Sequence, residues 1–135
     1  MINIIPANSA MPNGFIKTLA FRERSPCKKD FIAMINGQPV GLVSFDEYPT
    51  QNDGWVQLIY VLPEFRKNRV GSELLEYIET HAISRKLSSI GLDPKAVNSP
   101  MHLDAQFPDS LRLEQWYASK GYVASPKGSM HKSLL

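Results

Sequence analysis

The spacing of apolar residues along this chain changes from short continuous runs to a helical period. Residues 31–35 and 40–45 are compact apolar runs of strand length, and the Asn-Gly pair between them favours a turn because it tolerates positive φ. Residues 55–62 form the longest run of β-branched and aromatic residues, and Pro63 ends it. The pattern predicts a hairpin followed by a third strand.

A helical period follows, from about residue 70 to residue 87. Its apolar positions have the three- and four-residue spacing of one buried face: Leu74, Leu75, Ile78 and Ala82. Residues 88–93 then predict a short strand that Pro94 closes. Because a strand–helix–strand connection is right-handed, we expect the strands at 55–62 and 88–93 to be parallel.

Breakers and caps define the remaining segments. Residues 46–54 are polar and predict a loop, and residues 95–108 predict an irregular loop with two prolines. Asp109 or Ser110 then caps a second helix, which runs to Lys120.

The order of these elements predicts the fold class. The first 30 residues or so can supply a strand and one short helix, and residues 122–134 predict a closing hairpin. The order hairpin, strand, helix, strand, helix, hairpin is typical of an α/β fold with a mixed sheet. At 135 residues, we expect a single domain over residues 1–135.

Composition narrows the classes of function. The net charge of +2 argues against a nucleic-acid-binding domain, which is usually clearly basic. Three histidines and one cysteine, Cys27, argue against a metal site, and the lone cysteine fits a reducing, cytoplasmic location. The N-terminus lacks the features of a signal peptide, and no apolar segment approaches the ~20 residues needed to span a membrane.

The turn at residues 66–71 follows a strand and opens a helix. Its backbone N–H groups lie at the positive end of the helix dipole, close to the cationic Arg66, Lys67 and Arg69. Pyrophosphate is a usual occupant of such a place, and Ser72 can add a hydroxyl hydrogen bond. A solvated basic turn is the alternative, but the strand–turn–helix context favours an anion site.

A second group of aromatic residues lies at the end of the second predicted helix. Trp116 is best interpreted as core packing. Tyr117 has two interpretations, core packing or a phenol that points into a cleft. In a cleft, the phenol can act as a general acid toward a leaving group of similar pKa.

Together these two segments and the closing strand resemble the GNAT superfamily of N-acetyltransferases. Family members share an Arg/Gln-x-x-Gly-x-Gly/Ala turn and an aromatic-Tyr-x-x-x-Gly-aromatic segment. Here the first motif reads Arg66-x-x-Arg69-x-Gly71, and the second reads Trp116-Tyr117-x-x-x-Gly121-Tyr122. The resemblance covers residues 31–134 and implies a GNAT-like acyl-CoA N-acyltransferase fold.

The resemblance also implies a reaction, in which an amine attacks the thioester of acetyl-CoA, the cosubstrate. It assigns the cosubstrate to the backbone of Tyr60 and Val61 and to the turn residues Arg66, Lys67, Asn68, Arg69, Val70, Gly71 and Ser72. Tyr117 would protonate the departing thiolate, and the Val61 N–H would stabilise the oxyanion. The acceptor would be a small-molecule, peptide or protein amine.

The chain departs from the family pattern at several positions. Arg69 replaces the first glycine of the turn, where a positive φ would strain an arginine. Ser110 stands where many members have asparagine. Trp55 occupies the place of the usual glutamate base, and Gln57 cannot act as one.

These departures leave alternatives for the general base and for the form of the acceptor site. Asp46, Glu47, His102 or Asp104 could act as the base through water, or no base is needed if the pKa of the amine is low. The short N-terminal region indicates either an open acceptor cleft or a site completed by a second subunit. A homodimer is therefore one of the alternatives. A GNAT-fold module that acts by binding CoA or a protein is the alternative to an enzyme.

Overall fold

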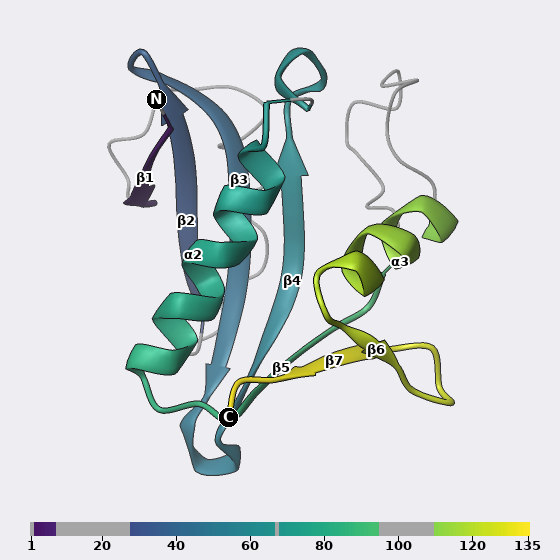
Figure 1. Ribbon diagram of the computed structural model, residues 1–135. Coiled ribbons are helices and arrows are strands. Elements are labelled where there is room, and N and C mark those ends of the chain that lie inside the picture. The colour runs from purple at the N-terminus through teal and green to yellow at the C-terminus, as the bar shows by residue number, and fades with distance from the viewer. Residues whose placement is uncertain (1, 8–27, 67, 95–109) are drawn as a thin grey trace.

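One mixed β-sheet forms the centre of the molecule (Figure 1). The computed structural model describes residues 2–7, 28–66, 68–94 and 110–135. Within these ranges the strands lie in the order β1-β2-β3-β4-β5-β7-β6. Their bounds are Asn3–Pro6 (β1), Lys28–Ile35 (β2), Gln38–Tyr48 (β3), Asp53–Val61 (β4), Ser89–Leu92 (β5), Val123–Ala124 (β6) and Met130–Ser133 (β7). The expected α/β fold with a mixed sheet is confirmed.

The predicted first hairpin is confirmed. β2 and β3 pair antiparallel, and the turn between them places Asn36 at φ 51° and Gly37 at φ 76°. Asparagine and glycine tolerate this left-handed conformation better than other residues, which explains why the chain reverses here. β1 adds to the outer edge of β2 and supplies the strand expected from the first 30 residues.

β4 and β5 are parallel, as the sequence predicted. The pairing runs from Asp53 opposite Ser89 to Val56 opposite Leu92, and every other strand pair in the described sheet is antiparallel. β4 then continues to Val61, whereas β5 ends at Leu92. In Figure 1 the two strands diverge beyond their paired segment, with β7 and β6 on the side of β5.

Helix α2, Val70–Ser84, covers one face of the sheet over β2, β3 and β4 (Figure 1). All four predicted apolar positions are buried: Leu74, Leu75, Ile78 and Ala82. The helix ends at Ser84 rather than at residue 87, because Lys86 has φ 62° and turns the chain. The N–H of Leu87 donates to the carbonyl of Ala82 at 3.0 Å, as in a Schellman cap.

The loop predicted at residues 46–54 is mostly wrong. β3 runs to Tyr48 and β4 begins at Asp53, so only the 3-10 turn Pro49–Gln51 and Asn52 connect them. Asp46 and Glu47 are each only 4% exposed. Oε1 of Glu47 lies 2.5 Å from Nε2 of His81, and its Oε2 lies 3.4 Å from Nε of Arg85. These partners from α2 compensate for burying a carboxylate within a strand.

The C-terminal part of the chain consists of helix α3, Ser110–Ser119, and the hairpin of β6 and β7. The helix lies within the predicted range, and Gly121 follows it at φ 96°, a conformation that favours glycine. Asp109 lies outside the described residues. The structure places β7 between β5 and β6, so the hairpin joins the sheet through its second strand.

Replacing Glu47 with alanine is expected to destabilise the protein by about 1–3 kcal/mol, because it removes a buried acceptor from His81 and Arg85. Urea unfolding of the wild type and of Glu47→Ala measures the loss. The matched control is Glu114→Ala, at an exposed position on α3, where the change should stay within about 0.5 kcal/mol. Equal stability of the two variants would contradict a structural role for Glu47.

Candidate functional site

A cleft of about 360 Å³ opens where β4 and β5 part. β4 forms one wall, and the start of α2 and helix α3 contribute the others. Its described lining residues are Val56, Gln57, Leu58, Ile59, Tyr60, Val61, Arg66, Arg69, Gly71, Ser72, Asp93, Arg112, Leu113, Trp116 and Tyr117. Three chain segments that are distant in sequence therefore contribute to one concave site.

The cleft exposes backbone hydrogen-bonding groups of β4. The N–H of Leu62 donates to the carbonyl of Val40 on the β3 side at 2.9 Å. Because successive strand residues direct their backbone groups to opposite sides, the N–H groups of Val61 and Ile59 face the edge that β5 has left. The backbone of Tyr60 faces β3 instead, and Ile59, which the sequence interpretation did not name, has its N–H at the open edge.

The turn before α2 starts the helix without a side-chain cap. Arg69 is the N-cap of α2, in the left-handed region at φ 62° and ψ 14°, and no side chain caps the helix. The ladder of helical hydrogen bonds starts with the N–H of Glu73 donating to the carbonyl of Arg69 at 2.9 Å. The N–H groups of Val70, Gly71 and Ser72 precede this bond and are left for an anion at the positive end of the helix.

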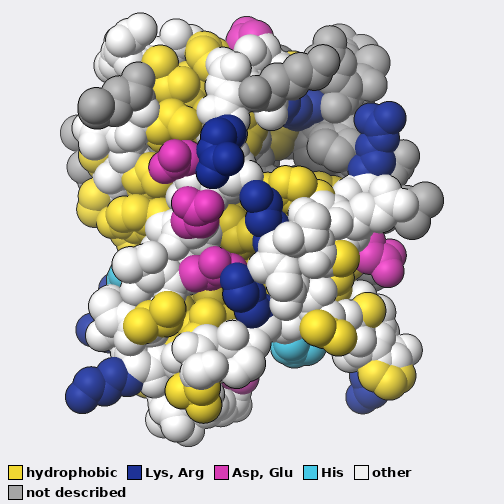
Figure 2. Space-filling model, viewed as in Figure 1, with side chains coloured by type: hydrophobic (Ala, Val, Ile, Leu, Met, Phe, Trp, Pro, Cys, Tyr) yellow, Lys and Arg dark blue, Asp and Glu magenta, His cyan; other side chains and the backbone are white. Residues whose placement is uncertain are grey.

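Two arginine side chains border this turn. Nε of Arg66 donates to the carbonyl of Val61 at 2.9 Å, and its guanidinium lies 5.3 Å from the centre of the Tyr60 ring. The guanidinium of Arg69 lies 3.7 Å from Glu76, and both side chains are mostly exposed. Figure 2 shows basic and acidic side chains beside one another down the middle of this face. An exposed pair of this kind contributes less than about 1 kcal/mol, so a phosphate can displace Glu76.

Tyr117 lies in the wall that α3 contributes. The residue is 6% exposed and packs edge-on against Trp116 and Tyr122, with ring centres 4.9 and 5.7 Å away. Burial raises the pKa of Tyr117 above its ordinary value of 10, which keeps the phenol protonated. Its hydroxyl makes no hydrogen bond with another residue in the described ranges, so it can serve a ligand in the cleft.

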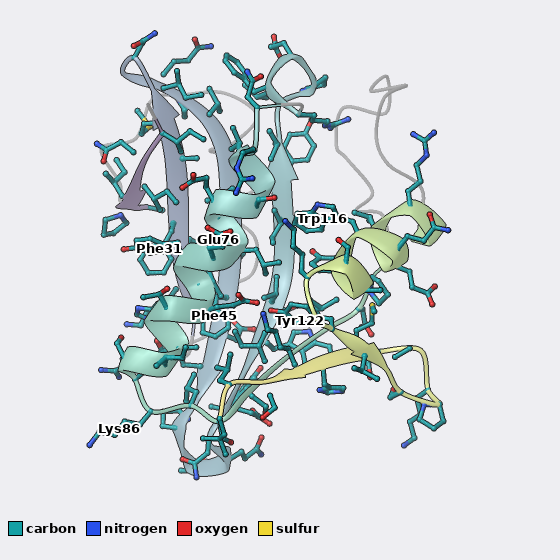
Figure 3. All side chains as sticks on the ribbon, viewed as in Figure 1. Phe31, Phe45, Glu76, Lys86, Trp116 and Tyr122 are labelled. Carbon is teal, nitrogen blue, oxygen red and sulfur yellow. The ribbon has the colours of Figure 1, made fainter. Side chains whose placement is uncertain are left out.

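A polar cluster next to Tyr117 joins α2 to Tyr122 and the C-terminal hairpin. Oε2 of Glu79 accepts the hydroxyl hydrogen of Tyr122 at 2.9 Å and a hydrogen of Nζ of Lys132 at 3.0 Å. Burial first, and Glu79 second, raise the pKa of Tyr122, so this phenol stays a donor. Figure 3 shows Tyr122 between α2 and α3, with Trp116 on the side of α3 that faces β4 and the start of α2.

The structure brings together most of the residues that the sequence assigned to the site. Those that line the cleft are Tyr60, Val61, Arg66, Arg69, Gly71, Ser72 and Tyr117. Asn68 does not line it, and Val70 is fully buried, so Val70 can offer only its backbone. Lys67 lies outside the described residues.

The four candidate bases divide into three groups. Glu47 is held by His81 and Arg85 on the α2 side of the sheet, away from the cleft. Asp46 accepts a hydrogen bond from Gln57, which does line the cleft. His102 and Asp104 lie outside the described residues. Among the residues that are described, no group of three or more His, Cys, Asp or Glu side chains could hold a metal ion.

Comparison with known proteins identifies the family. A sequence model of the acetyltransferase (GNAT) family matches residues 8–103, more than half of the chain. The chain belongs to this family. No curated protein matches the sequence significantly. No described helix is both long and apolar enough to cross a membrane.

Solved structures of the family share the whole fold at low sequence identity. A GNAT acetyltransferase from Staphylococcus aureus has a TM-score of 0.73 at 13% identity, covering 100% of both chains. One from Elizabethkingia anophelis, with acetyl-CoA bound, has a TM-score of 0.72 at 14% identity, covering 98% of this chain and 97% of its own. The alanine N-acetyltransferase for a ribosomal protein in Escherichia coli has a TM-score of 0.66 at 17% identity, covering 99% and 94%.

We expect replacement of Arg69 with glycine to have opposite effects on stability and on ligand affinity. Glycine relieves a left-handed strain of about 1–2 kcal/mol, partly offset by the greater freedom of the unfolded chain. The free energy of unfolding should therefore stay equal or rise by up to about 1 kcal/mol. Acetyl-CoA affinity should fall several-fold at low salt and less at high salt, because a guanidinium is lost.

The matched control is Lys86→Gly, because Lys86 also has φ 62° but lies beyond the other end of α2. It should relieve the same strain and leave acetyl-CoA affinity unchanged. Calorimetric titration at two salt concentrations, with thermal unfolding of each variant, measures both quantities. Arg69→Gly protein that binds as tightly as the wild type at low salt would show that Arg69 does not contact the phosphates.

Proposed function

We propose that this protein is an acetyl-CoA-dependent N-acetyltransferase that acetylates a primary amine by direct attack, with Tyr117 as the general acid. One observation carries the proposal. The hydroxyl-bearing Tyr117, the open edge of β4 and the uncapped start of α2 line the same cleft. Binding of acetyl-CoA by a relative of the same fold supports the choice of cosubstrate.

The cosubstrate would lie along β4. Its pantetheine arm carries amides, and these can pair with the N–H groups of Val61 and Ile59 as a missing strand would. Its pyrophosphate would then reach the N–H groups of residues 70–72, with Arg66 and Arg69 at the border of the site. The thioester at the other end would lie near the fork between β4 and β5.

The chemistry follows from this placement. The amine nitrogen attacks the thioester carbonyl, and the carbonyl oxygen gains negative charge that a backbone N–H of β4 can stabilise. The carbon–sulfur bond then breaks, and Tyr117 gives its proton to the departing thiolate. The raised pKa keeps Tyr117 protonated at neutral pH, so the proton is available, and it also makes the phenol a weaker acid toward the thiolate.

A module that binds CoA or a protein without catalysis is the second candidate. Two features favour it. Trp55 stands where the family commonly has a glutamate base, and Arg69 replaces the first glycine of the turn at a strained φ. Neither feature closes the cleft, so the two candidates differ in turnover rather than in ligand binding.

Saturating acetyl-CoA is expected to raise the melting temperature of the protein, because a ligand that binds only the native state stabilises it by mass action. Thermal unfolding with and without the ligand measures the shift. A thiol-release assay with a panel of primary amines then tests turnover. An unchanged melting temperature contradicts the proposed cosubstrate, whereas a shift without thiol release favours the binding module.

Replacing Tyr117 with phenylalanine is expected to lower kcat about a hundredfold or more and to leave acetyl-CoA affinity unchanged, because only the acidic proton is lost. Since the pKa of Tyr117 lies above 10, wild-type activity should rise with pH as the amine deprotonates and should not fall before pH 10. Tyr77→Phe on α2, outside the cleft, is the control. Full activity of Tyr117→Phe would remove this assignment.

A further inference from the structure

Two polar residues lie where β4 and β5 separate. Val56 opposite Leu92 is the last pair of the parallel ladder, so Gln57 and Asp93 are the next residues on the two chain segments. Both are exposed and both line the cleft. Val56 and Leu92 are buried in the core cluster that contains α2, whereas Gln57 is the unpaired residue of a β-bulge between Val56 and Leu58 and its side chain turns toward Asp46 of β3.

The amide of Gln57 has a fixed orientation. Nε2 of Gln57 donates to Oδ2 of Asp46 at 2.7 Å, and a carboxylate can only accept, so the amino group of the amide must face Asp46. The amide oxygen is left without a hydrogen bond to a described residue. Gln57 therefore presents an acceptor to the cleft, in a direction set by a carboxylate that is only 4% exposed.

The charged side chains among the described lining residues are those of Arg66, Arg69, Arg112 and Asp93. Arg66 and Arg69 border the turn that precedes α2, where the phosphates of CoA would bind. Asp93 brings a negative charge to the fork and makes no hydrogen bond or ion pair with another residue of the described ranges. With Arg66 and Arg69 facing the phosphates of CoA, Asp93 is the one carboxylate of the described lining that can attract a positive charge.

We propose that Gln57 and Asp93 bind the acceptor amine, that Asp46 is a positioning residue for Gln57, and that the acceptor is a primary amine on a positively charged molecule. This inference rests on the proposed N-acetyltransferase function. The oxygen of Gln57 accepts a hydrogen bond from the amine, and Asp93 attracts the ammonium form or a second positive charge nearby. Gln57 binds the amine without acting as a base, since an amide does not take up a proton at neutral pH.

The proton balance follows. The ammonium loses one proton to water before attack. The neutral amine then forms a carbon–nitrogen bond as the carbon–sulfur bond breaks. Tyr117 protonates the thiolate and regains a proton, through water, from the new amide nitrogen. The products are the N-acetyl amine and the CoA thiol.

A matched series of acceptors tests the charge requirement. 1,4-Diaminobutane, butylamine and 4-aminobutanoate have the same chain length and differ in charge at the far end. At low salt, kcat/KM should fall in that order by about tenfold overall. Two short peptides that differ only in a Lys or Glu beside the acceptor amine extend the test to peptides. A preference for the basic member in either series supports the proposal.

Three substitutions then test the residues. Gln57→Met keeps the side-chain length and should raise the KM of every amine about tenfold, while the KM of acetyl-CoA stays unchanged. Asp93→Asn should make the charged and uncharged amines nearly equal. Asp46→Ala should act like Gln57→Met, and Asp46→Asn should restore the amine KM, because an asparagine oxygen can still accept from Nε2 of Gln57.

The controls are Gln115→Met and Glu114→Gln, both at exposed positions on α3 outside the cleft. Active wild-type protein that turns over the three amines equally, with Gln57→Met unchanged in amine KM, overturns this inference and leaves the proposed function standing. Wild-type protein that binds acetyl-CoA but releases no thiol with any amine overturns both.

Discussion

The separation of β4 from β5 is the constraint on which the rest of the site depends. β5 ends at Leu92, and Pro94 soon after it has no N–H to continue the ladder. β4 continues to Val61, so one edge of a central strand has backbone donors and acceptors without a neighbouring strand. Such groups are costly to bury without partners. A ligand with amide groups can complete this edge, and the fold thereby selects for an amide-bearing arm such as pantetheine.

The same separation leaves a cleft that both helices line. α2 is the next helix after β4 and the 3-10 turn Pro63–Phe65, and its uncapped N-terminus lines the same cleft as the exposed edge. α3 lies across the cleft, and Glu79 of α2 holds the following segment through Tyr122 and Lys132. Tyr122 packs against Tyr117, so this polar contact lies next to the cleft wall although Glu79 itself does not line the cleft. The start of α2 and the wall that contains Tyr117 are thus connected through the protein.

Local signals in the sequence predicted most elements, and the failures occurred where distant partners decide the structure. The apolar period of α2 and the parallel pair around it depend on neighbouring residues, and both were predicted correctly. Asp46 and Glu47 suggested a loop because their partners, Gln57, His81 and Arg85, lie 11 or more positions away. The same limit hid the position of the Ile59 N–H at the open edge of β4, since its direction depends on the register with β3. Lys86 ends α2 without the glycine that would have indicated a cap.

Arg69 shows how one substitution can be tolerated at such a site. The turn requires a left-handed residue, and an arginine there costs about 1–2 kcal/mol relative to glycine. The side chain lies at the border of the cleft in a weak, exposed pair with Glu76. A guanidinium that is already near the anion site and only weakly held can move to a phosphate with little reorganisation. The strain is therefore compatible with a working site, because the added charge acts at the place where the ligand is most negative.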